Sequence, residues 1–267
     1  MGRRRSRAGT SLFWISVVTF VSTLALLWQG IAIFREEFPS VGALKHQFPR
    51  VIYKGRGKPF DVALSRSKPE SWVSLDEVSR FASGAVVVSE DWAFYQHGGI
   101  DARQMREALI EDLERGRFAR GASTITQQVV KNVFLDHEKS LWRKLKEVIL
   151  AIQLEQSLGK RRILEIYLNI AEWGEGVFGI RAAARHYFDK PPSALTAKEG
   201  AFLAMLLPSP KKYSQSFRSG KLSDFARRQV RSILGKMVQA GFLDPAALEA
   251  EAAAPLPFEF EASTGGL

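Results

Sequence analysis

The sequence predicts a mainly α-helical protein with a single transmembrane helix at its N-terminus. Residues 11–34 contain no charged side chain, and this length exceeds the roughly 20 residues that cross a bilayer core. Between residues 70 and 250, apolar residues recur at helical spacing, and no convincing series of alternating strands is found. We therefore expect one mostly helical domain behind one membrane anchor.

The residues that flank the apolar run predict its orientation. Arg3, Arg4, Arg5 and Arg7 precede it, whereas Arg35-Glu36-Glu37 follows it. Because cytoplasmic flanks carry the excess of Lys and Arg, residues 1–10 should form a basic cytoplasmic tail. A cleaved signal peptide is the alternative, but its apolar core has typically about 7–15 residues. No clear small-x-small cleavage site follows the run either, so we expect a retained anchor over residues 11–34.

Charge and composition exclude several classes of function. The 267 residues carry a formal net charge of +10, and such a surface could attract nucleic acid, anionic lipid or a phosphate-bearing substrate. Placement outside the cytoplasm excludes nucleic acid and favours membrane lipid or a lipid-linked phosphate. The chain has no cysteine and four scattered histidines. Disulfides and a cysteine nucleophile are therefore excluded, and no metal site is expected.

Local signals divide the rest of the chain. Residues 35–70 are rich in proline, glycine and scattered charge, which predicts an extracytoplasmic stem with little regular structure. A capping box at Ser74 and Glu77 begins the folded domain, which we expect over residues 71–252. The Pro-, Ala- and Gly-rich residues 253–267 should form a disordered tail. Further helices are expected after Asp101 and over 123–135, 140–158, 160–170, 196–207 and 223–240.

Residues 121–132 combine helical periodicity with uncharged hydrogen-bonding side chains. As a helix capped by Ser123, the segment places Ile125, Val129 and Val133 toward a core. A second face carries hydroxyls, amides and one ammonium group, from Ser123, Thr124, Gln127, Gln128 and Lys131. Such a face suits a sugar attached to a phosphate. It also suits an ordinary solvated helix, and the segment alone leaves both interpretations open.

Two glutamates are candidates for catalysis. Glu90 precedes Trp92, Phe94 and Tyr95, and such apolar neighbours raise a carboxyl pKa toward the range useful for proton transfer. Glu147 shares a predicted helix face with Lys144 and Arg143, which lie three and four positions earlier. It also lies off the predicted core stripe of that helix. That stripe comprises Leu141, Leu145, Val148, Ile149 and Ile152. Taken singly, Glu90 also fits a surface or capping acid, and Glu147 also fits a surface ion pair.

Five ordered blocks, spanning roughly residues 75–215, favour the catalytic interpretation of both glutamates. They are Glu90-Asp-x-x-Phe-x-x-His97-x-Gly99-x-Asp101, Gly121-Ala-Ser-Thr-x-Thr-Gln-Gln-x-x-Lys-Asn132, Arg143-Lys-x-x-Glu147, Lys160 through Asn169, and Leu195-x-x-x-Glu199. Together they resemble the peptidoglycan glycosyltransferase family, the lysozyme-like polymerase domain shared with bifunctional penicillin-binding proteins. The resemblance implies a lysozyme-like, bilobal glycosyltransferase domain. Because the chain ends soon after it, the resemblance is to the monofunctional type.

The resemblance also implies a reaction. Its substrate would be lipid II, and the growing lipid-linked glycan would be transferred to the 4-hydroxyl of an acceptor lipid II with inversion. Polyprenyl pyrophosphate would be released. The enzyme would act at the outer face of a bacterial inner membrane, with lipid II, the growing glycan and membrane lipids as partners. Other proteins of cell-wall synthesis and division are further candidate partners, and nucleic acid is not.

Site roles follow from the same resemblance, position by position. Glu90 would be the catalytic base, and Glu147 would act beside the donor pyrophosphate. The implied substrate-binding residues are Asp91, Ser123, Thr124, Gln127, Gln128, Lys131, Lys139, Lys144 and Asn169. At Lys139 the family often has an arginine, and lysine lacks the bidentate fork of arginine. No cofactor is implied with certainty, although a divalent cation such as Mg²⁺ could accompany the pyrophosphate.

Two other functions remain alternatives at this stage. A lysozyme-like fold also occurs in glycan-cleaving enzymes, but cleavage needs no pyrophosphate site. A catalytically inactive membrane scaffold would not need both glutamates and Lys131. The Arg-flanked amphipathic stretch at 103–120 is a candidate for lying on the membrane surface, and an ordinary solvated helix face is its alternative.

Overall fold

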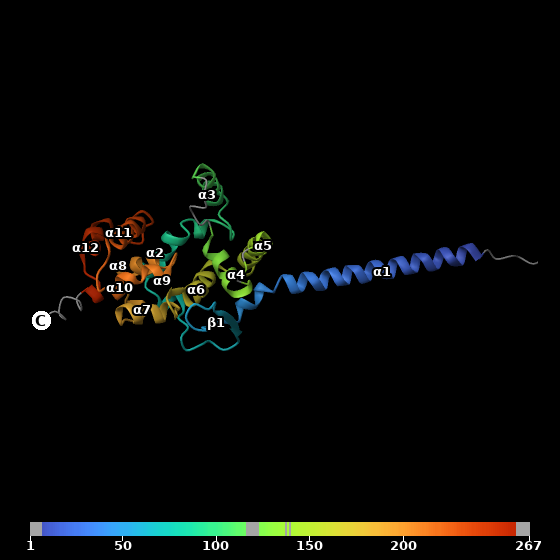
Figure 1. Ribbon diagram of the computed structural model, residues 1–267, viewed down its shortest axis with the longest axis horizontal. Coiled ribbons are helices and arrows are strands. Elements are labelled where there is room, and N and C mark those ends of the chain that lie inside the picture. The colour runs from blue at the N-terminus through green and yellow to red at the C-terminus, as the bar shows by residue number, and fades with distance from the viewer. Residues whose placement is uncertain (1–6, 116–122, 137, 139, 260–267) are drawn as a thin grey trace, which may run out of the picture. The chain divides into compact units, whose positions relative to one another are not determined.

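The computed structural model describes residues 7–115, 123–136, 138 and 140–259. It is mainly helical, as the sequence predicts, and its strands are short (Figure 1). The chain divides into two compact units, Met1–Ser40 and Val41–Leu267. Each unit is described by itself.

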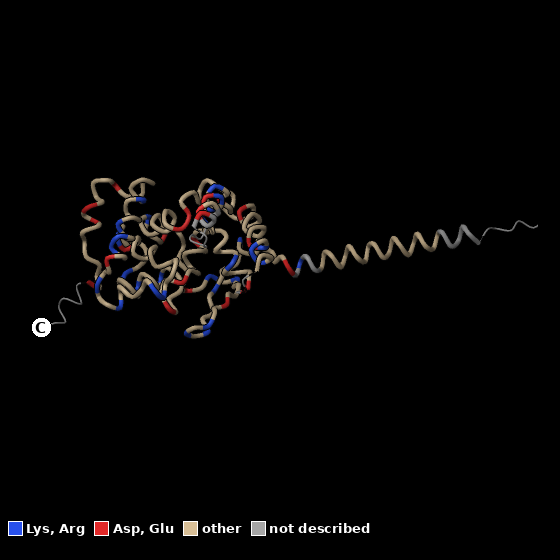
Figure 2. Tube along the Cα trace, turned by 45° about the horizontal axis from the view of Figure 1, so that its top comes forward, with Lys and Arg blue, Asp and Glu red and all other residues tan. Residues whose placement is uncertain are grey.

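The first unit consists of helix α1 (Arg7–Glu37). Its segment Phe13–Ala32 has a mean hydropathy of 1.8 over 20 residues, which is long and apolar enough to cross a membrane. Figure 2 shows this segment in the colour of uncharged residues. Its large apolar side chains are exposed, with Trp28 at 75%. The predicted single candidate span is thus present among the described residues.

After the 3-10 helix Val41–Lys45, the second unit contains a β-hairpin that the sequence did not predict. Strands β1 (Phe48–Ile52) and β2 (Asp61–Ser65) pair antiparallel, with Phe48 opposite Ser65. The expectation of little regular structure over residues 35–70 is therefore wrong. The hairpin is held by distant residues, since Phe48 packs on Trp72 with ring centroids 5.1 Å apart. The guanidinium of Arg162 lies over both rings.

One group of helices packs around α8 (Ala197–Leu206), in which every residue is buried. Helices α2 (Arg80–Glu90) and α11 (Asp224–Gln239) lie against it. Gly200 permits the close approach of α2, because a Cβ there would lie 2.7 Å from the Cα of Ala82. This packing fixes the position of α2, whose last residue is Glu90.

A second group contains α4 (Ile125–Phe134), α5 (Leu141–Ser157) and α6 (Lys160–Ile170). Helix α4 contacts both of its neighbours, and Ile125 and Val129 are buried on it, as predicted. Its N-cap is Thr124 and not the predicted Ser123, because the Thr124 hydroxyl accepts the Gln127 amide proton. Figure 1 shows this group beside the α8 group.

The predicted core stripe of α5 is wrong. Leu141 is 91% exposed and Leu145 is 48% exposed. The helix instead buries Glu147, Leu150, Ala151 and Leu154. Helical periodicity identifies an apolar face, but it does not say which face the neighbouring helices α4 and α6 cover.

The remaining elements complete the second unit. They are α3 (Ala102–Arg115), β3 (Glu172–Gly174), β4 (Val177–Phe178), α7 (Ile180–Phe188), α9 (Pro210–Tyr213), α10 (Gln215–Arg218), α12 (Leu248–Ala253) and five short 3-10 helices (Val41–Lys45, Leu75–Glu77, Phe94–Gln96, Pro192–Ala194, Pro245–Ala247). Leu256 and Phe258 are buried, and Phe258 packs on Phe202 with ring centroids 5.2 Å apart. The expectation of a disordered tail from residue 253 is therefore wrong for these two positions.

Candidate active site

Glu90 ends α2 at the junction between the two helix groups. Its Oε2 atom accepts a hydrogen bond from Gln128 Nε2 of α4, at 2.8 Å. Burial raises the pKa of the Glu90 carboxyl, and the nearby charge of Asp91 raises it further. Gln128, Lys131 and Tyr167 oppose this shift by favouring the ionised form. The predicted pKa elevation is confirmed in direction, and the group is suited to accept a proton.

Tyr167 of α6 orients the amide that faces Glu90. Its side chain is buried, and its hydroxyl donates to Gln128 Oε1 at 3.2 Å. Burial and the charge of Glu90 raise the pKa of Tyr167 well above its ordinary value. The hydroxyl therefore keeps its proton and engages the amide oxygen, which leaves the amide nitrogen for Glu90. Tyr167 lies in the fourth block, Lys160 through Asn169, but the sequence analysis gave it no role, because local spacing does not indicate its contact with Gln128.

Asp91 joins the end of α2 to the start of α4. Its Oδ2 atom accepts from the backbone amide of Ile125 at 3.0 Å, and its two oxygens lie 2.9 and 3.1 Å from His97 Nε2. Since His97 Nδ1 accepts from the Gly99 amide, the ring proton lies on Nε2 and is donated to Asp91. The carboxylate also lies at a helix N-terminus, where negative charge is favoured. Asp91 thus holds α4, and with it Gln128, beside Glu90.

A cationic cluster surrounds the second glutamate. Glu147 is 2% exposed and accepts from Arg143 Nη1 at 3.2 Å and from Lys144 Nζ. Lys144 also donates to Ser123 Oγ at 3.1 Å. The pKa of Lys131 is lowered by burial and by Arg143 and Lys144, against the opposing charge of Glu147. Three cations thus face one carboxylate, and this excess positive charge suits an anion.

Helix α4 connects the cluster to Glu90. Gln128 and Lys131 lie one turn apart on the same face, so one contacts Glu90 and the other approaches Glu147. The charges of Glu90 and Lys131 also act on each other's pKa. A base and an anion site therefore lie within electrostatic reach of each other. We call Glu90, Gln128, Lys131, Arg143, Lys144 and Glu147 the polar centre.

Four predicted substrate-binding residues have internal partners instead. Thr124 and Gln127 are fully buried in the capping box of α4, and Asp91 is buried as described above. Asn169 exchanges hydrogen bonds with the backbone of Val73 and donates to Glu165 O, all at 2.8 Å. These four side chains position the helices that carry the polar centre. Lys139 lies outside the described residues.

The Glu147 carboxylate of the polar centre is engaged by basic side chains, and the described residues around it are arranged for an anion. No cluster of three or more His, Cys, Asp or Glu side chains occurs in the described parts of the chain. Both carboxylate oxygens of Glu147 are engaged by Arg143 and Lys144. The local chemistry is that of a site where basic side chains neutralise an anion.

Comparison with known families agrees with this arrangement. Residues 56–238 match the protein family described as Transglycosylase, which is more than half of the chain. The chain belongs to this family. The matched range contains the whole polar centre of this transglycosylase, and it begins within the β1–β2 hairpin.

Similar curated proteins carry the name biosynthetic peptidoglycan transglycosylase. One from Nitrosomonas eutropha is 47% identical over 156 residues, covering 58% of this chain and 64% of its own length. One from Nitrosospira multiformis is 41% identical over 206 residues, covering 72% and 88%. One from Azoarcus sp. is 44% identical over 160 residues, covering 58% and 69%.

Proposed function

We propose that this transglycosylase polymerises peptidoglycan glycan strands from lipid II. The lipid-linked glycan is transferred to the 4-hydroxyl of an acceptor lipid II, with inversion and release of polyprenyl pyrophosphate. The observation that carries the proposal is that helix α4 joins a half-buried carboxyl of raised pKa, Glu90, to a cationic cluster: its Gln128 contacts Glu90, and its Lys131 lies within electrostatic reach of Arg143 and Lys144. The names of the relatives support the same activity.

Glu90 serves as the general base. A sugar hydroxyl is a weak acid, so its oxygen becomes a competent nucleophile only as its proton leaves. The raised pKa of Glu90 brings the carboxylate closer in basicity to that task. Glu90 takes the proton from the 4-hydroxyl, and the oxygen attacks C1 of the donor sugar. The bond from C1 to the phosphate oxygen breaks, and the electron pair leaves with the pyrophosphate.

Lys131, Arg143 and Lys144 receive the leaving group. Negative charge develops on the pyrophosphate as the bond breaks, and preplaced cations stabilise that charge. Arg143 and Lys144 are held by Glu147. Ser123 adds a hydroxyl beside Lys144.

Glu147 acts on the basic residues rather than on the substrate. A carboxylate beside a pyrophosphate has the wrong sign for direct contact, but this one is buried and engaged by two cations. Its charge also favours the protonated form of Lys131. Glu147 is therefore a positioning residue that orients the cations that bind the donor.

The protein meets the membrane through two apolar surfaces. One is the span of α1, with the arginine-rich N-terminus in the cytoplasm and the transglycosylase domain outside it. The other is the exposed face of α5, formed by Leu141, Trp142, Leu145 and Ile152. Apolar side chains beside basic ones are typical of a helix that lies in the lipid interface. Contact there would bring the cationic cluster of α5 to the level of a lipid-linked pyrophosphate.

The domain boundaries drawn from the sequence remain part of this proposal. They place a cytoplasmic tail at 1–10 and an anchor at 11–34, whereas the start of the catalytic domain moves from residue 71 to Val41, because the compact unit begins there and includes the hairpin. Protein partners from cell-wall synthesis and division belong to the same set of proposals. Limited proteolysis of the purified chain would test this boundary, because strands β1 and β2 should resist cleavage with the rest of the unit.

A glycan-cleaving enzyme is the main competing function. Cleavage would need an acid to protonate a sugar leaving group and a water nucleophile. It would give no role to Lys131, Arg143 and Lys144, whose charge suits a pyrophosphate. An inactive scaffold would not need the Glu90 network.

One assay separates the three functions. The full-length protein is incubated with labelled lipid II or, in parallel, with preformed glycan, and the products are resolved by length. We expect long strands from lipid II and no change in preformed glycan. Shortened glycan with unused lipid II would establish cleavage, and no reaction of either substrate would establish the scaffold.

A further inference from the structure

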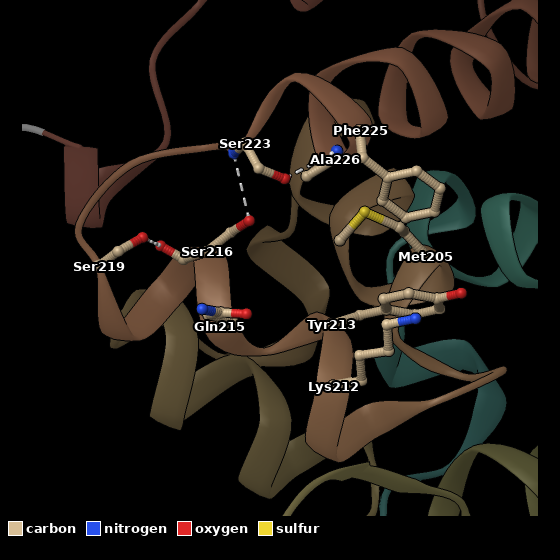
Figure 3. A pocket seen from close by; sticks show the side chains of 9 residues that line it. All are labelled: Met205, Lys212, Tyr213, Gln215, Ser216, Ser219, Ser223, Phe225 and Ala226. Atoms are coloured by element: carbon tan, nitrogen blue, oxygen red, sulfur yellow. Dashed lines mark hydrogen bonds between the residues drawn. The ribbon is translucent and has the colours of Figure 1, made fainter.

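A pocket of about 390 Å³ lies outside the polar centre, between α9, α10 and the start of α11, with α8 beneath it (Figure 3). This volume falls in the range of about 300–1,000 Å³ that small-molecule sites occupy. None of the residues of the polar centre line it. The mechanism proposed above gives the pocket no role.

One side of the pocket is an aromatic platform. Tyr213 and Phe225 have ring centroids 5.3 Å apart and planes inclined by 32°. Phe225 is 41% exposed, whereas Met205 beneath the rings is buried. Figure 3 shows the two rings and Met205 on the same side of the pocket. Two neighbouring rings open to solvent offer a surface on which a ligand could stack.

The other side of the pocket is polar. Figure 3 places Gln215, Ser216 and Ser219 across from the rings. Ser219 donates to Ser216 O, and Ser216 Oγ accepts from the Ser223 amide, so both serines serve the backbone. In contrast, the Gln215 amide makes no hydrogen bond within the described part of the chain. It is free to donate to and accept from a ligand.

Lys212 adds a positive charge beside the rings. Its Nζ lies 5.8 Å from the centroid of Tyr213, and no described carboxylate forms an ion pair with it. The pocket thus combines an aromatic platform, one amide and one cation. A purely apolar ligand would leave the amide and the ammonium without partners, which is unfavourable where water is displaced.

We propose that this pocket binds a sugar–peptide unit of peptidoglycan, away from the site of glycosyl transfer. The apolar face of a sugar ring would lie on Tyr213 and Phe225, its N-acetyl and hydroxyl groups on Gln215, and a peptide carboxylate on Lys212. The identity of the ligand rests on the proposed function, whereas the existence of the pocket is independent of it. Binding in this pocket would keep the glycan attached to the enzyme, outside the polar centre, during elongation.

The test measures binding without polymerisation. Full-length protein carrying Glu90→Gln is titrated, in detergent, with a soluble disaccharide-peptide that has no lipid or pyrophosphate, and binding is followed by calorimetry. Phe225→Ala and Lys212→Ala are then added singly to the same protein. Lys58→Ala, in the exposed loop of the β-hairpin, is the control for loss of one positive charge.

We expect Phe225→Ala and Lys212→Ala each to weaken binding about tenfold, which corresponds to about 1.4 kcal/mol. Lys58→Ala should leave the affinity unchanged. Amidation of the peptide carboxylate should reproduce the effect of Lys212→Ala and add nothing to that variant. Both residues are exposed, so the fold should survive, and thermal unfolding checks this.

Absence of binding to the parent protein, or equal binding by all variants, would overturn the inference. That result would leave the polymerisation assay unaffected, so failure of the pocket and failure of the proposed function are distinguishable. A four-sugar fragment identifies the source of the ligand. Tighter binding of this fragment assigns the pocket to a glycan strand, and equal binding assigns it to a single repeat unit.

Discussion

Gln128 donates a hydrogen bond to Glu90 across the junction of the two helix groups, with 2.8 Å between Nε2 and Oε2. This contact favours the ionised form of a carboxyl whose pKa burial raises. It therefore balances two needs, since Glu90 must be ionised to act as a base and basic enough to take a proton. The orientation of Gln128 depends in turn on Tyr167.

The first prediction concerns the acid limb of the pH–rate profile. Activity should fall as pH falls through the raised pKa of Glu90, above the range of an ordinary glutamate. Gln128→Leu removes a contact that lowers this pKa, so the acid limb should move to higher pH. Tyr167→Phe should move it in the same direction by less. The measurement is initial rate on lipid II against pH.

Gln239→Leu, at the exposed end of α11, is the matched control and should leave the limb in place. If the acid limb of Gln128→Leu moved to lower pH, Gln128 could not be the donor that favours the ionised form of Glu90. A lower rate with an unmoved limb would mean that Gln128 serves packing alone.

The second prediction concerns Lys131. Lys131→Ala should lower kcat by about 10²–10³-fold, the usual loss when one group that stabilises developing negative charge is removed. Lys131→Arg should restore part of the rate because it keeps the charge. Since the pKa of Lys131 is lowered, the wild-type rate should decline at alkaline pH before an ordinary lysine would lose its proton.

Lys236→Ala on α11 controls for net charge in these rate measurements. The assignment of Lys131 fails if Lys131→Ala and Lys236→Ala have the same kcat. It also fails if the alkaline limb is identical in wild type and Lys131→Arg, because arginine stays charged over this range.

The third prediction separates the two glutamates. Glu147→Gln should raise KM for lipid II, because Arg143 and Lys144 lose the carboxylate that orients them. The acid limb should stay in place, since Glu147 is not the base. The alkaline limb should move to lower pH, because Glu147 supports the protonated form of Lys131. A shifted acid limb would instead assign Glu147 to proton transfer.

The fourth prediction concerns the exposed face of α5. The double variant Leu141→Ser/Leu145→Ser should lower activity on vesicle-embedded lipid II, because each leucine buried in lipid contributes about 1.5–3 kcal/mol. Activity on short-chain lipid II in detergent should change much less. Ile52→Ser/Leu64→Ser removes two exposed apolar side chains from the hairpin and is the control. Equal losses in vesicles and detergent would argue against a membrane-facing α5.

Short-range patterns in the sequence predicted several helices of the fold and some contacts of the candidate site. Helical periodicity and caps located α4, α5, α6, α8 and α11, and the spacing of Glu147 with Arg143 and Lys144 predicted their ion pairs. The apolar neighbours of Glu90 predicted the direction of its pKa shift. The helices and the ion pairs depend on residues that are close in sequence, whereas the pKa of Glu90 also depends on the distant residues Gln128, Lys131 and Tyr167.

Features that depend on distant residues were missed or wrongly assigned. The β-hairpin is held by Trp72 and Arg162, and Tyr167 reaches Gln128 from 39 positions away. The exposed face of α5 was taken for a core face because its pattern is the same in both settings. The N-cap of α4 is Thr124 and not the predicted Ser123. The Thr124 hydroxyl is fixed by a distant contact, because it also donates to Gly99 O at 2.7 Å.

The central claim is that Glu90 is the base of glycan polymerisation, and Glu90→Gln tests it most directly. The amide keeps the size of the side chain but cannot take a proton at this site, so polymerisation of labelled lipid II should fall by at least about 10²-fold. Thermal unfolding and binding of lipid II should be retained. Strands of wild-type length formed at the wild-type rate by Glu90→Gln would contradict the account.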